Sequence, residues 1–273
     1  MNLRVPGATL HYDVRGTGPM LLISQSGEGD ADRSVDLVDR LVDRYTVITY
    51  DRRGLSRSVM DDPEGGVTMR DHADDVHRLL AAVTDEPVAM LGCSLGAVIG
   101  LHLSVAHPEQ IHTLVAHEPV APWLLPADEA DHHRRELAEL QEIHRRDGWT
   151  AAIKEVARVL GIDPASQDRE PGLTPQPMTP ERGANFDFFL AHDFTAVITD
   201  ALDPASLGGV RIIPAAGRTT PREVFDYRCA QELARVVGAD IAEFPGGHNG
   251  NLTHPRAYAA RLVECLSSAG RTI

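Results

Sequence analysis

The sequence has few cysteines, almost no lysine and no long hydrophobic run, and each shortage excludes a class of protein. Its three cysteines, Cys93, Cys229 and Cys265, form no C-x-x-C pair, which argues against a disulfide framework and a structural zinc site. No apolar run reaches the roughly 18 residues of a membrane-spanning helix, and the first residues contain no apolar stretch of signal-peptide length. We therefore expect a cytoplasmic protein with no metal and no membrane partner.

Positive charge is also scarce. The chain has 26 lysine and arginine residues against 40 aspartate and glutamate residues, which gives a net charge of −14. A field of this sign repels phosphate backbones, so we expect no nucleic-acid partner. Lys154 is the only lysine, a bias that GC-rich coding explains without a functional role. The length of 273 residues suits one large domain, or one domain with an inserted subdomain.

Short apolar runs alternate with helical patterns over most of the chain. Strands are expected at 20–23, 45–50, 88–91, 111–116, 210–213 and 240–244. Helices are expected at 35–42, 72–83, 223–237 and 255–266, and in a segment that ends at residue 105. Strands that are apolar throughout and alternate with helices predict a parallel sheet covered on both faces, which is an α/β fold.

The alternation stops at residue 119 and returns at residue 210. The residues between them contain helical patterns, and five prolines between positions 163 and 180 predict an irregular loop there. We interpret 119–208 as a helical cap inserted into a core formed by 1–118 and 209–273.

The segment Gly92-Cys93-Ser94-Leu95-Gly96 matches the pattern G-x-S-x-G at the junction of a predicted strand and a predicted helix. Glycines two residues before and after the serine keep β-carbons out of a sharp turn that exposes the serine oxygen. We predict that Ser94 is a catalytic nucleophile. The alternative is a plain strand-to-helix turn.

A serine nucleophile requires a base, and His248 is the best candidate among the 13 histidines. It follows the last predicted strand in a glycine-rich loop, whose backbone freedom allows the imidazole to reach the edge of the sheet. Four other histidines are expected to be solvated or to cap helices: His102, His107, His112 and His132. None has a spacing such as H-E-x-x-H, so we predict no metal.

Together with Asp51-Arg52-Arg53-Gly54-Leu55-Ser56-Arg57-Ser58, these motifs resemble the α/β-hydrolase superfamily over nearly the whole chain. The resemblance implies an eight-stranded, mostly parallel sheet with helices on both faces and a helical cap inserted after the sixth strand. The segment 51–54 is expected to support the loop beside Ser94. We further expect a small-molecule substrate, no cofactor, and a monomer or homodimer.

The resemblance also locates an oxyanion hole. When the strand at 21–23 is aligned with the family, Gln25 and Ser26 stand where His-Gly is common. The backbone N–H groups of Gly27 and Leu95 would then stabilise the oxyanion, because backbone donors tolerate changes of side chain. Glu28 would oppose a developing negative charge unless its side chain points away or serves a particular substrate.

The catalytic acid departs from the usual position of the family. The turn after the strand at 210–213, residues 217–221, contains no carboxylate. Some family members place the acid at the end of the preceding core strand, where this chain has Glu118. We predict that Glu118 orients His248, with Asp226 a weaker candidate because it falls on a predicted helix. Alternatively, Glu118 caps the strand and His248 works with a threonine hydroxyl, with water or alone.

Aromatic residues are concentrated in the predicted cap. Both tryptophans and four of the six phenylalanines lie within 119–208. We expect Trp123, Phe186 and Phe189 to bind an apolar part of the substrate. The alternative is that a small cap needs these residues for its own core.

Three functions therefore compete. The first is a serine hydrolase that cleaves an ester, thioester or lactone through an acyl-enzyme; carbon–carbon hydrolysis and cyclisation occur on the same fold. The second is a degenerate hydrolase fold that binds a ligand. The third is a nucleotide-binding protein, suggested by Gly27-x-Gly29 after a strand. It is disfavoured because Asp32 replaces the third glycine and acidic residues crowd the phosphate position.

Overall fold

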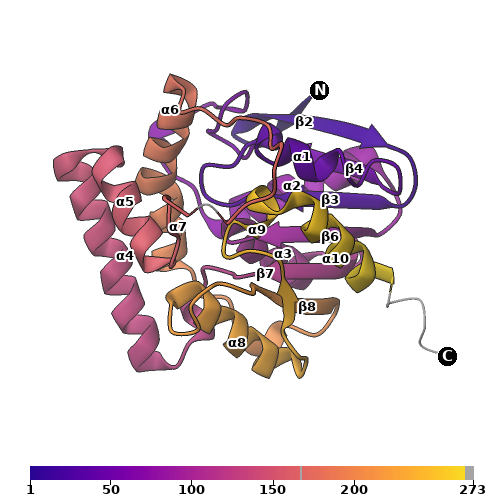
Figure 1. The fold of residues 1–273 in the computed structure, drawn as a ribbon. Helices are drawn as coiled ribbons and strands as arrows, with labels where there is room; N and C mark the ends of the chain where they lie inside the picture. The colour runs from indigo at the N-terminus through magenta and orange to yellow at the C-terminus, as the bar shows by residue number, and fades with distance from the viewer. Residues whose placement is uncertain (167, 268–273) are drawn as a thin grey trace.

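The computed structural model describes residues 1–166 and 168–267. Figure 1 shows one central sheet, helices against both of its faces and a group of helices at one end. The strands are β1 (Asn2–Val5), β2 (Ala8–Gly16), β3 (Met20–Ser24), β4 (Thr46–Tyr50), β5 (Val59–Met60), β6 (Val88–Cys93), β7 (Ile111–His117), β8 (Arg211–Gly217) and β9 (Ala242–Phe244).

The α-helices are α1 (Val35–Val38), α2 (Met69–Val83), α3 (Leu95–Ala106), α4 (Ala127–Asp147), α5 (Trp149–Val159), α6 (Pro180–Phe188), α7 (Phe194–Thr199), α8 (Phe225–Val237), α9 (Gly250–Thr253) and α10 (Pro255–Ser267). A π-helical turn, η4 (Phe189–Asp193), joins α6 to α7. The 3-10 turns are η1 (Ala31–Ser34), η2 (Pro63–Gly65), η3 (Pro122–Leu124) and η5 (Pro204–Ser206). In the described residues no helix combines the length and the apolar character that crossing a membrane requires.

The predicted α/β fold is confirmed. Eight strands follow the order β1-β2-β4-β3-β6-β7-β8-β9. The six strands from β4 to β9 in this order are parallel to one another, and β2 pairs with β4 in the antiparallel direction. The described sheet has nine strands rather than eight because β5 adds a two-residue antiparallel pairing with β2. The helix expected at 35–42 is also shorter than predicted, since α1 ends at Val38 and tight turns follow.

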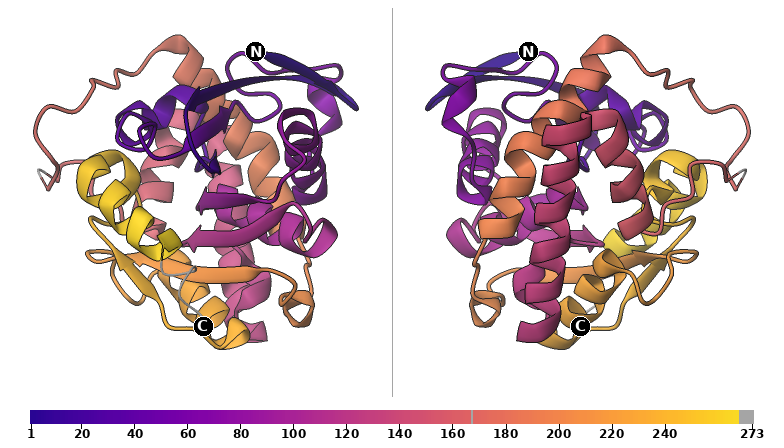
Figure 2. Two further views of the ribbon diagram at one scale, coloured as in Figure 1. Left: turned by 90° about the vertical axis from the view of Figure 1, so that its right-hand side faces the viewer. Right: turned by 90° about the vertical axis from the view of Figure 1, so that its left-hand side faces the viewer.

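Alternate residues of the strands build two hydrophobic cores, because side chains of a strand point to opposite faces in turn. Leu22, Ile48 and Met90 contribute to the core beneath α2, α3 and α8. Leu21, Val47 and Leu91 contribute to the core on the other face, beneath α1 and α10. Figure 2 shows these helices on opposite sides of the sheet. The parallel strands are therefore buried on both faces, which fixes the positions of the loops at their carboxyl ends.

The segment between β7 and β8 contains α4, α5, α6 and α7, with an irregular stretch between α5 and α6. These helices lie together at one end of the sheet, on the left of Figure 1. Helix α4 packs along α5 and α7, and Leu137, Leu140 and Val156 of this group are continuous with the core beneath α2, α3 and α8.

Candidate active site

Ser94 lies at the tip of a sharp turn between β6 and α3. Its backbone has φ 55° and ψ −115°, a left-handed conformation that is costly for any residue with a β-carbon. A β-carbon at Gly92 would lie 2.5 Å from the carbonyl oxygen of Gly96, and one at Gly96 would collide with the Ser24 carbonyl of β3. Both glycines are thus required by close backbone approach, and the strained serine is held in place by the surrounding core.

His248 is held by Glu118. The Nδ1–H of His248 donates a hydrogen bond of 2.7 Å to Oε2 of Glu118. Glu118 follows β7 with φ 45°, and its other oxygen accepts a hydrogen bond of 2.7 Å from the backbone N–H of Gly217. Both side chains are buried. Two donors therefore fix the Glu118 carboxylate, and the carboxylate in turn fixes the ring, which leaves Nε2 of His248 as the acceptor.

Asp226 is a second carboxylate at the same ring nitrogen. Its Oδ2 lies 2.5 Å from Nδ1 of His248 and its side chain is fully buried, but neither of its oxygens has a directed hydrogen bond in the described structure. Asp226 lies in the first turn of α8. A helical position makes Asp226 the weaker candidate on sequence alone, but the start of α8 brings its carboxylate to His248.

The three buried groups shift one another's pKa values. Burial is the main cause that raises the pKa of Asp226, and the neighbouring Glu118 raises it further. Burial acts in the same direction on Glu118, but its hydrogen bond to His248 and the attraction of His117 and His248 together outweigh burial and hold the pKa of Glu118 low. Burial alone would lower the pKa of His248, whereas the attraction of Asp226 and Glu118 raises it. Asp226 is consequently the carboxyl group that keeps its proton more readily.

Two backbone N–H groups beside Ser94 have no acceptor in the described part of the chain. One is that of Leu95, the first residue of α3, and the other is that of Gly27, which lines the same cavity as Ser94. Such N–H groups can donate to an oxyanion. The ring of Phe189 fills the space where a β-carbon at Gly27 would lie.

Arg52 holds the loop that carries Gly27. Its fully buried guanidinium donates to the carbonyl oxygens of Gln25, Ser26 and Gly27, at 3.2 Å for Gln25 and 2.7 Å for Ser26. It also lies 3.1 Å from Oδ2 of Asp193 in η4. Since Arg52 contacts both these carbonyl groups and Asp193, it links the loop that carries Gly27 to η4 in the helical segment.

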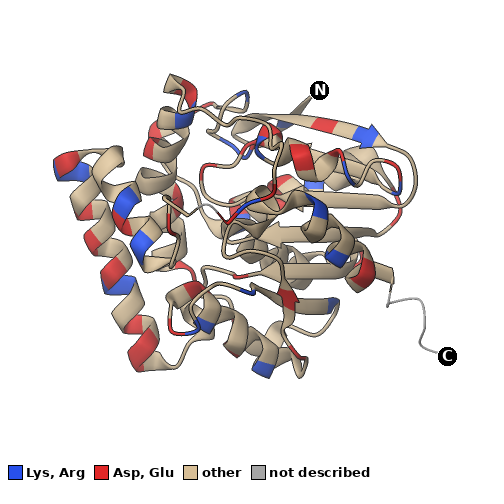
Figure 3. Ribbon diagram, viewed as in Figure 1, with Lys and Arg blue, Asp and Glu red and all other residues tan. Residues whose placement is uncertain are grey.

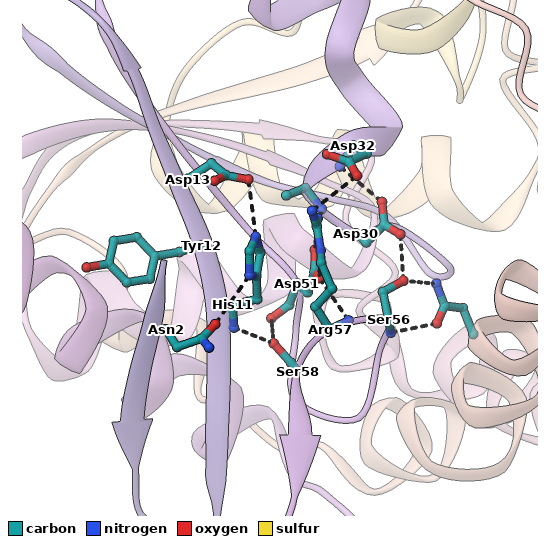
Figure 4. A network of polar contacts seen from close by, with 12 residues as sticks. Asn2, His11, Tyr12, Asp13, Asp30, Asp32, Asp51, Ser56, Arg57 and Ser58 are labelled. Atoms are coloured by element: carbon teal, nitrogen blue, oxygen red, sulfur yellow. Dashed lines mark hydrogen bonds and ion pairs between the residues drawn. The ribbon is translucent and has the colours of Figure 1, made fainter.

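A second polar network joins the loop after β4 to the same helical segment. Figure 4 shows Arg57 beside Asp51 and Ser56 beside Asp30. Nε of Arg57 donates a hydrogen bond of 2.8 Å to Oδ2 of Asp51, and Oγ of Ser56 donates one of 2.6 Å to Oδ2 of Asp30. Ser56 Oγ also accepts a hydrogen bond of 2.8 Å from the side-chain amide of Asn185 in α6. The motif after β4 therefore supports both the core loops and the helices above them.

Two of the cavities in the structure touch Ser94. The outer cavity has a volume of about 320 Å³ and is also lined by Gly27, His248, Phe186 and Phe189. The inner cavity, of about 20 Å³, is apolar apart from Ser94 and is also bounded by Phe189. Phe189 lines both spaces, as Val156 and Leu160 do, and Phe186 lies in the wall of the outer one.

Trp123 lines neither of these cavities. It is buried in η3, and its indole N–H donates a hydrogen bond of 2.8 Å to Oδ2 of Asp200. The same oxygen lies 2.8 Å from Nε2 of His102, which is buried as well. Trp123 therefore belongs to the packing of the helical segment, and His102 is a core residue rather than a solvated one.

Three charged residues line the outer cavity: Glu28, which the sequence places near the oxyanion hole, and Arg33 and Lys154, which the sequence alone does not indicate. The carboxylate of Glu28 accepts two hydrogen bonds from Arg182 in α6, of 2.6 Å and 2.8 Å, and lies 3.0 Å from Arg33. Its charge is thus compensated, which removes the conflict with a nearby oxyanion. The one available signal was that Lys154 is the only lysine.

The geometry can be compared with known proteins. A sequence model described as the alpha/beta hydrolase fold matches residues 19–142. The protein named "Uncharacterized hydrolase YraK" from Bacillus subtilis (strain 168) is 36% identical over 270 residues, which are 97% of this chain and 94% of that protein.

Solved structures extend the likeness of fold to the whole chain. The enol-lactonase from Burkholderia xenovorans LB400 has a TM-score of 0.73 at 20% identity, covering 98% of this chain and 100% of that chain. An esterase from Exiguobacterium antarcticum has a TM-score of 0.75 at 17% identity, covering 96% and 97%.

Proposed function

The chain belongs to the α/β-hydrolase family and is a hydrolase of that fold, and from this premise we propose that it is a serine hydrolase that cleaves an ester, thioester or lactone through an acyl-enzyme. One observation carries the proposal. His248 donates through Nδ1 to Glu118, so its other nitrogen is the acceptor, and the ring lines the same cavity as the strained Ser94. This arrangement supports the assignment of Ser94 as nucleophile, His248 as base and Glu118 as the acid that orients the base.

Each group has a step in the proposed reaction. Oγ of Ser94 attacks the carbonyl carbon while its proton passes to Nε2 of His248, and Glu118 stabilises the imidazolium that forms. The N–H groups of Gly27 and Leu95 donate to the oxyanion. His248 then gives its proton to the leaving alcohol or thiol. A water molecule then attacks the acyl carbon while its proton passes to His248. The bond from the acyl carbon to Oγ breaks, which releases the carboxylic acid, and His248 returns the proton to Oγ of Ser94.

The cavities support a small substrate. The outer volume of about 320 Å³ lies at the lower end of the range for small-molecule sites. The inner volume of about 20 Å³ has room for roughly one small group. Its wall of Val120, Leu137 and Phe194 favours an apolar group there. We therefore place a short apolar portion of the substrate in the inner cavity.

A fluorophosphonate probe tests the proposal directly, because it reacts with serines that an adjacent base activates. We expect stoichiometric labelling of Ser94, located by peptide mass spectrometry, and none in Ser94→Ala. Ser26 lines the same cavity, so Ser26→Ala is a matched control that keeps the labelling. Absence of labelling in the folded wild-type protein would contradict the serine mechanism and favour a degenerate, ligand-binding fold.

A further inference from the structure

The outer cavity has a charged rim on an otherwise largely apolar wall. Besides Ser94 and His248, its lining includes two cations, Arg33 and Lys154, and the single carboxylate of Glu28. The apolar part of the wall includes Ile153, Val156, Leu160, Ile162, Phe186 and Phe189. The cations are therefore the features of this wall that would distinguish a charged ligand from a neutral one.

Lys154 is an exposed cation without a protein partner. It lies on α5, and it makes no ion pair or hydrogen bond with any residue among those the structure describes. In contrast, Arg158 on the same helix contacts Glu155 at 2.8 Å and lies outside the cavity lining. The chain has 40 acidic residues, yet none of those described neutralises the ammonium group at the cavity. Lys154 is thus free to bind an anion.

Arg33 is the other cation at the rim. Arg33 and Arg182 share the one carboxylate of Glu28. Arg182 binds it in a bidentate manner, whereas Arg33 contacts one of its oxygens. Asp30 also attracts Arg33, and Arg33 donates a hydrogen bond of 2.6 Å to Gln176, so the charge of Arg33 is largely compensated. Lys154 is therefore the uncompensated cation at the rim, and Arg33 is a second cation in the same lining, in a chain whose net charge is −14. Figure 3 shows acidic residues spread over the rest of the fold, including α4.

We propose that the natural substrate carries a carboxylate, which Lys154 and Arg33 bind at the rim while the scissile carbonyl lies at Ser94. This inference rests on the proposed serine hydrolase and names its substrate class: a small ester or lactone of a carboxylate-bearing molecule. The small apolar inner cavity takes the uncharged end. The carboxylate therefore belongs to the end of the substrate that remains in the outer cavity.

The first test compares charged and neutral esters of similar shape. Hydrolysis of monomethyl glutarate is compared with that of methyl pentanoate, and that of the acetyl ester of γ-hydroxybutyrate with that of butyl acetate, by titration of released acid. The two pairs place the carboxylate on the acyl side and on the alcohol side, respectively. In at least one pair we expect the charged ester to have the higher kcat/KM.

Variants then connect this preference to the rim. The ratio of kcat/KM for the charged ester to that for the neutral ester should fall about fivefold in Lys154→Met, the size expected of one solvent-exposed ion pair. Lys154→Glu should reduce the ratio further, and high salt should reduce it in the wild type. Arg158→Met removes a cation from the same helix outside the cavity and should keep the ratio. A ratio that is the same in Lys154→Met and in the wild type overturns the inference.

A second test measures binding without turnover. Because Lys154 is the only lysine, trinitrobenzenesulfonate can modify only this side-chain amine, and the N-terminal amine serves as an internal control. In Ser94→Ala, monomethyl glutarate should slow the modification of Lys154, whereas methyl pentanoate should not. Equal modification rates with the two ligands contradict the carboxylate site. Protection of Lys154 combined with no ester hydrolysis by the wild type contradicts the serine hydrolase alone.

Discussion

Asp226 places a carboxylate oxygen 2.5 Å from Nδ1 of His248, although the N–H of that nitrogen is directed at Glu118. One imidazole therefore faces two buried carboxyl groups from different parts of the fold, the end of β7 and the start of α8. A single acid is sufficient to orient the base. The second one provides a reserve acceptor and an additional negative charge, and these two effects can be separated by substitution.

Because Asp226 can replace Glu118 as the acceptor, we expect the losses of turnover in the two variants to be non-additive. Glu118→Gln removes the directed partner of His248, but Asp226 can still accept from Nδ1, so the fall in turnover should be partial. The double variant Glu118→Gln/Asp226→Asn leaves no carboxylate and should lose on the order of 10⁴ in kcat, or roughly 5 kcal/mol of barrier height. Steady-state kinetics of the two single variants and the double variant measure the difference.

Other patterns would contradict this assignment. A full loss in Asp226→Asn with near-normal activity in Glu118→Gln would make Asp226 the acid. Equal and complete losses in both single variants would show that the two carboxylates act only together.

We expect the negative charge of Asp226 to affect how kcat/KM depends on pH. Burial lowers the pKa of His248, but Asp226 and Glu118 raise it above the ordinary range. The base must be neutral to accept the serine proton, so the acidic limb of kcat/KM reports this pKa. Asp226→Asn removes one source of the increase and should move the acidic limb to lower pH. A limb that stays in place, or moves to higher pH, would show that Asp226 carries no charge when the imidazole titrates.

We expect Phe189 to determine the selectivity for the length of the acyl chain. It is buried, touches both cavities at Ser94 and packs on Gly27. Phe189→Ala joins the two spaces and should raise the kcat/KM for long acyl chains relative to the shortest. It should also lower the free energy of unfolding by about 3–5 kcal/mol. Phe188→Ala is the control, because Phe188 packs on Gly54 and lines neither cavity. An unchanged chain-length profile would show that Phe189 only supports the fold.

We expect the buried His117 to make the protein less stable as the pH falls. It is fully buried, neither ring nitrogen has a hydrogen-bond partner in the described residues, and burial lowers its pKa from 6.5 to about 4. Between these values the unfolded chain binds a proton that the folded chain does not. The free energy of unfolding should therefore fall by about 3 kcal/mol as the pH drops from 6.5 to 4. Denaturant titrations should show a shallower fall in His117→Phe, and parallel curves would contradict a neutral buried imidazole.

Local signals in the sequence were enough to predict the parallel core and two of the candidate site residues. Strands such as β6 are apolar throughout, and Ser94 and His248 stand in short motifs with characteristic neighbours. Strand β2 was missed because exposed and buried residues mix along an antiparallel strand near the edge of the sheet. Its pattern is therefore weaker than that of a strand covered on both faces.

Contacts between distant segments could not be predicted in the same way. Nothing near Asp226 in the sequence indicates that the first turn of α8 faces His248. Trp123 was expected to bind substrate, yet its indole N–H pairs with Asp200, a choice set by how η3 packs against the end of α7. Lys154 is a candidate binding residue only because the fold places it in the lining of a cavity that Ser94 also lines. These relations depend on tertiary packing rather than on local pattern.

The central claim, that Ser94 forms an acyl-enzyme, is tested most directly by rapid acid quench during hydrolysis of an activated ester, followed by intact and peptide mass spectrometry. We predict a mass increase equal to the acyl group on the peptide that contains Ser94, and its absence in Ser94→Ala. Efficient ester hydrolysis with no acyl group on Ser94 at any quench time, and undiminished in Ser94→Ala, would contradict the account.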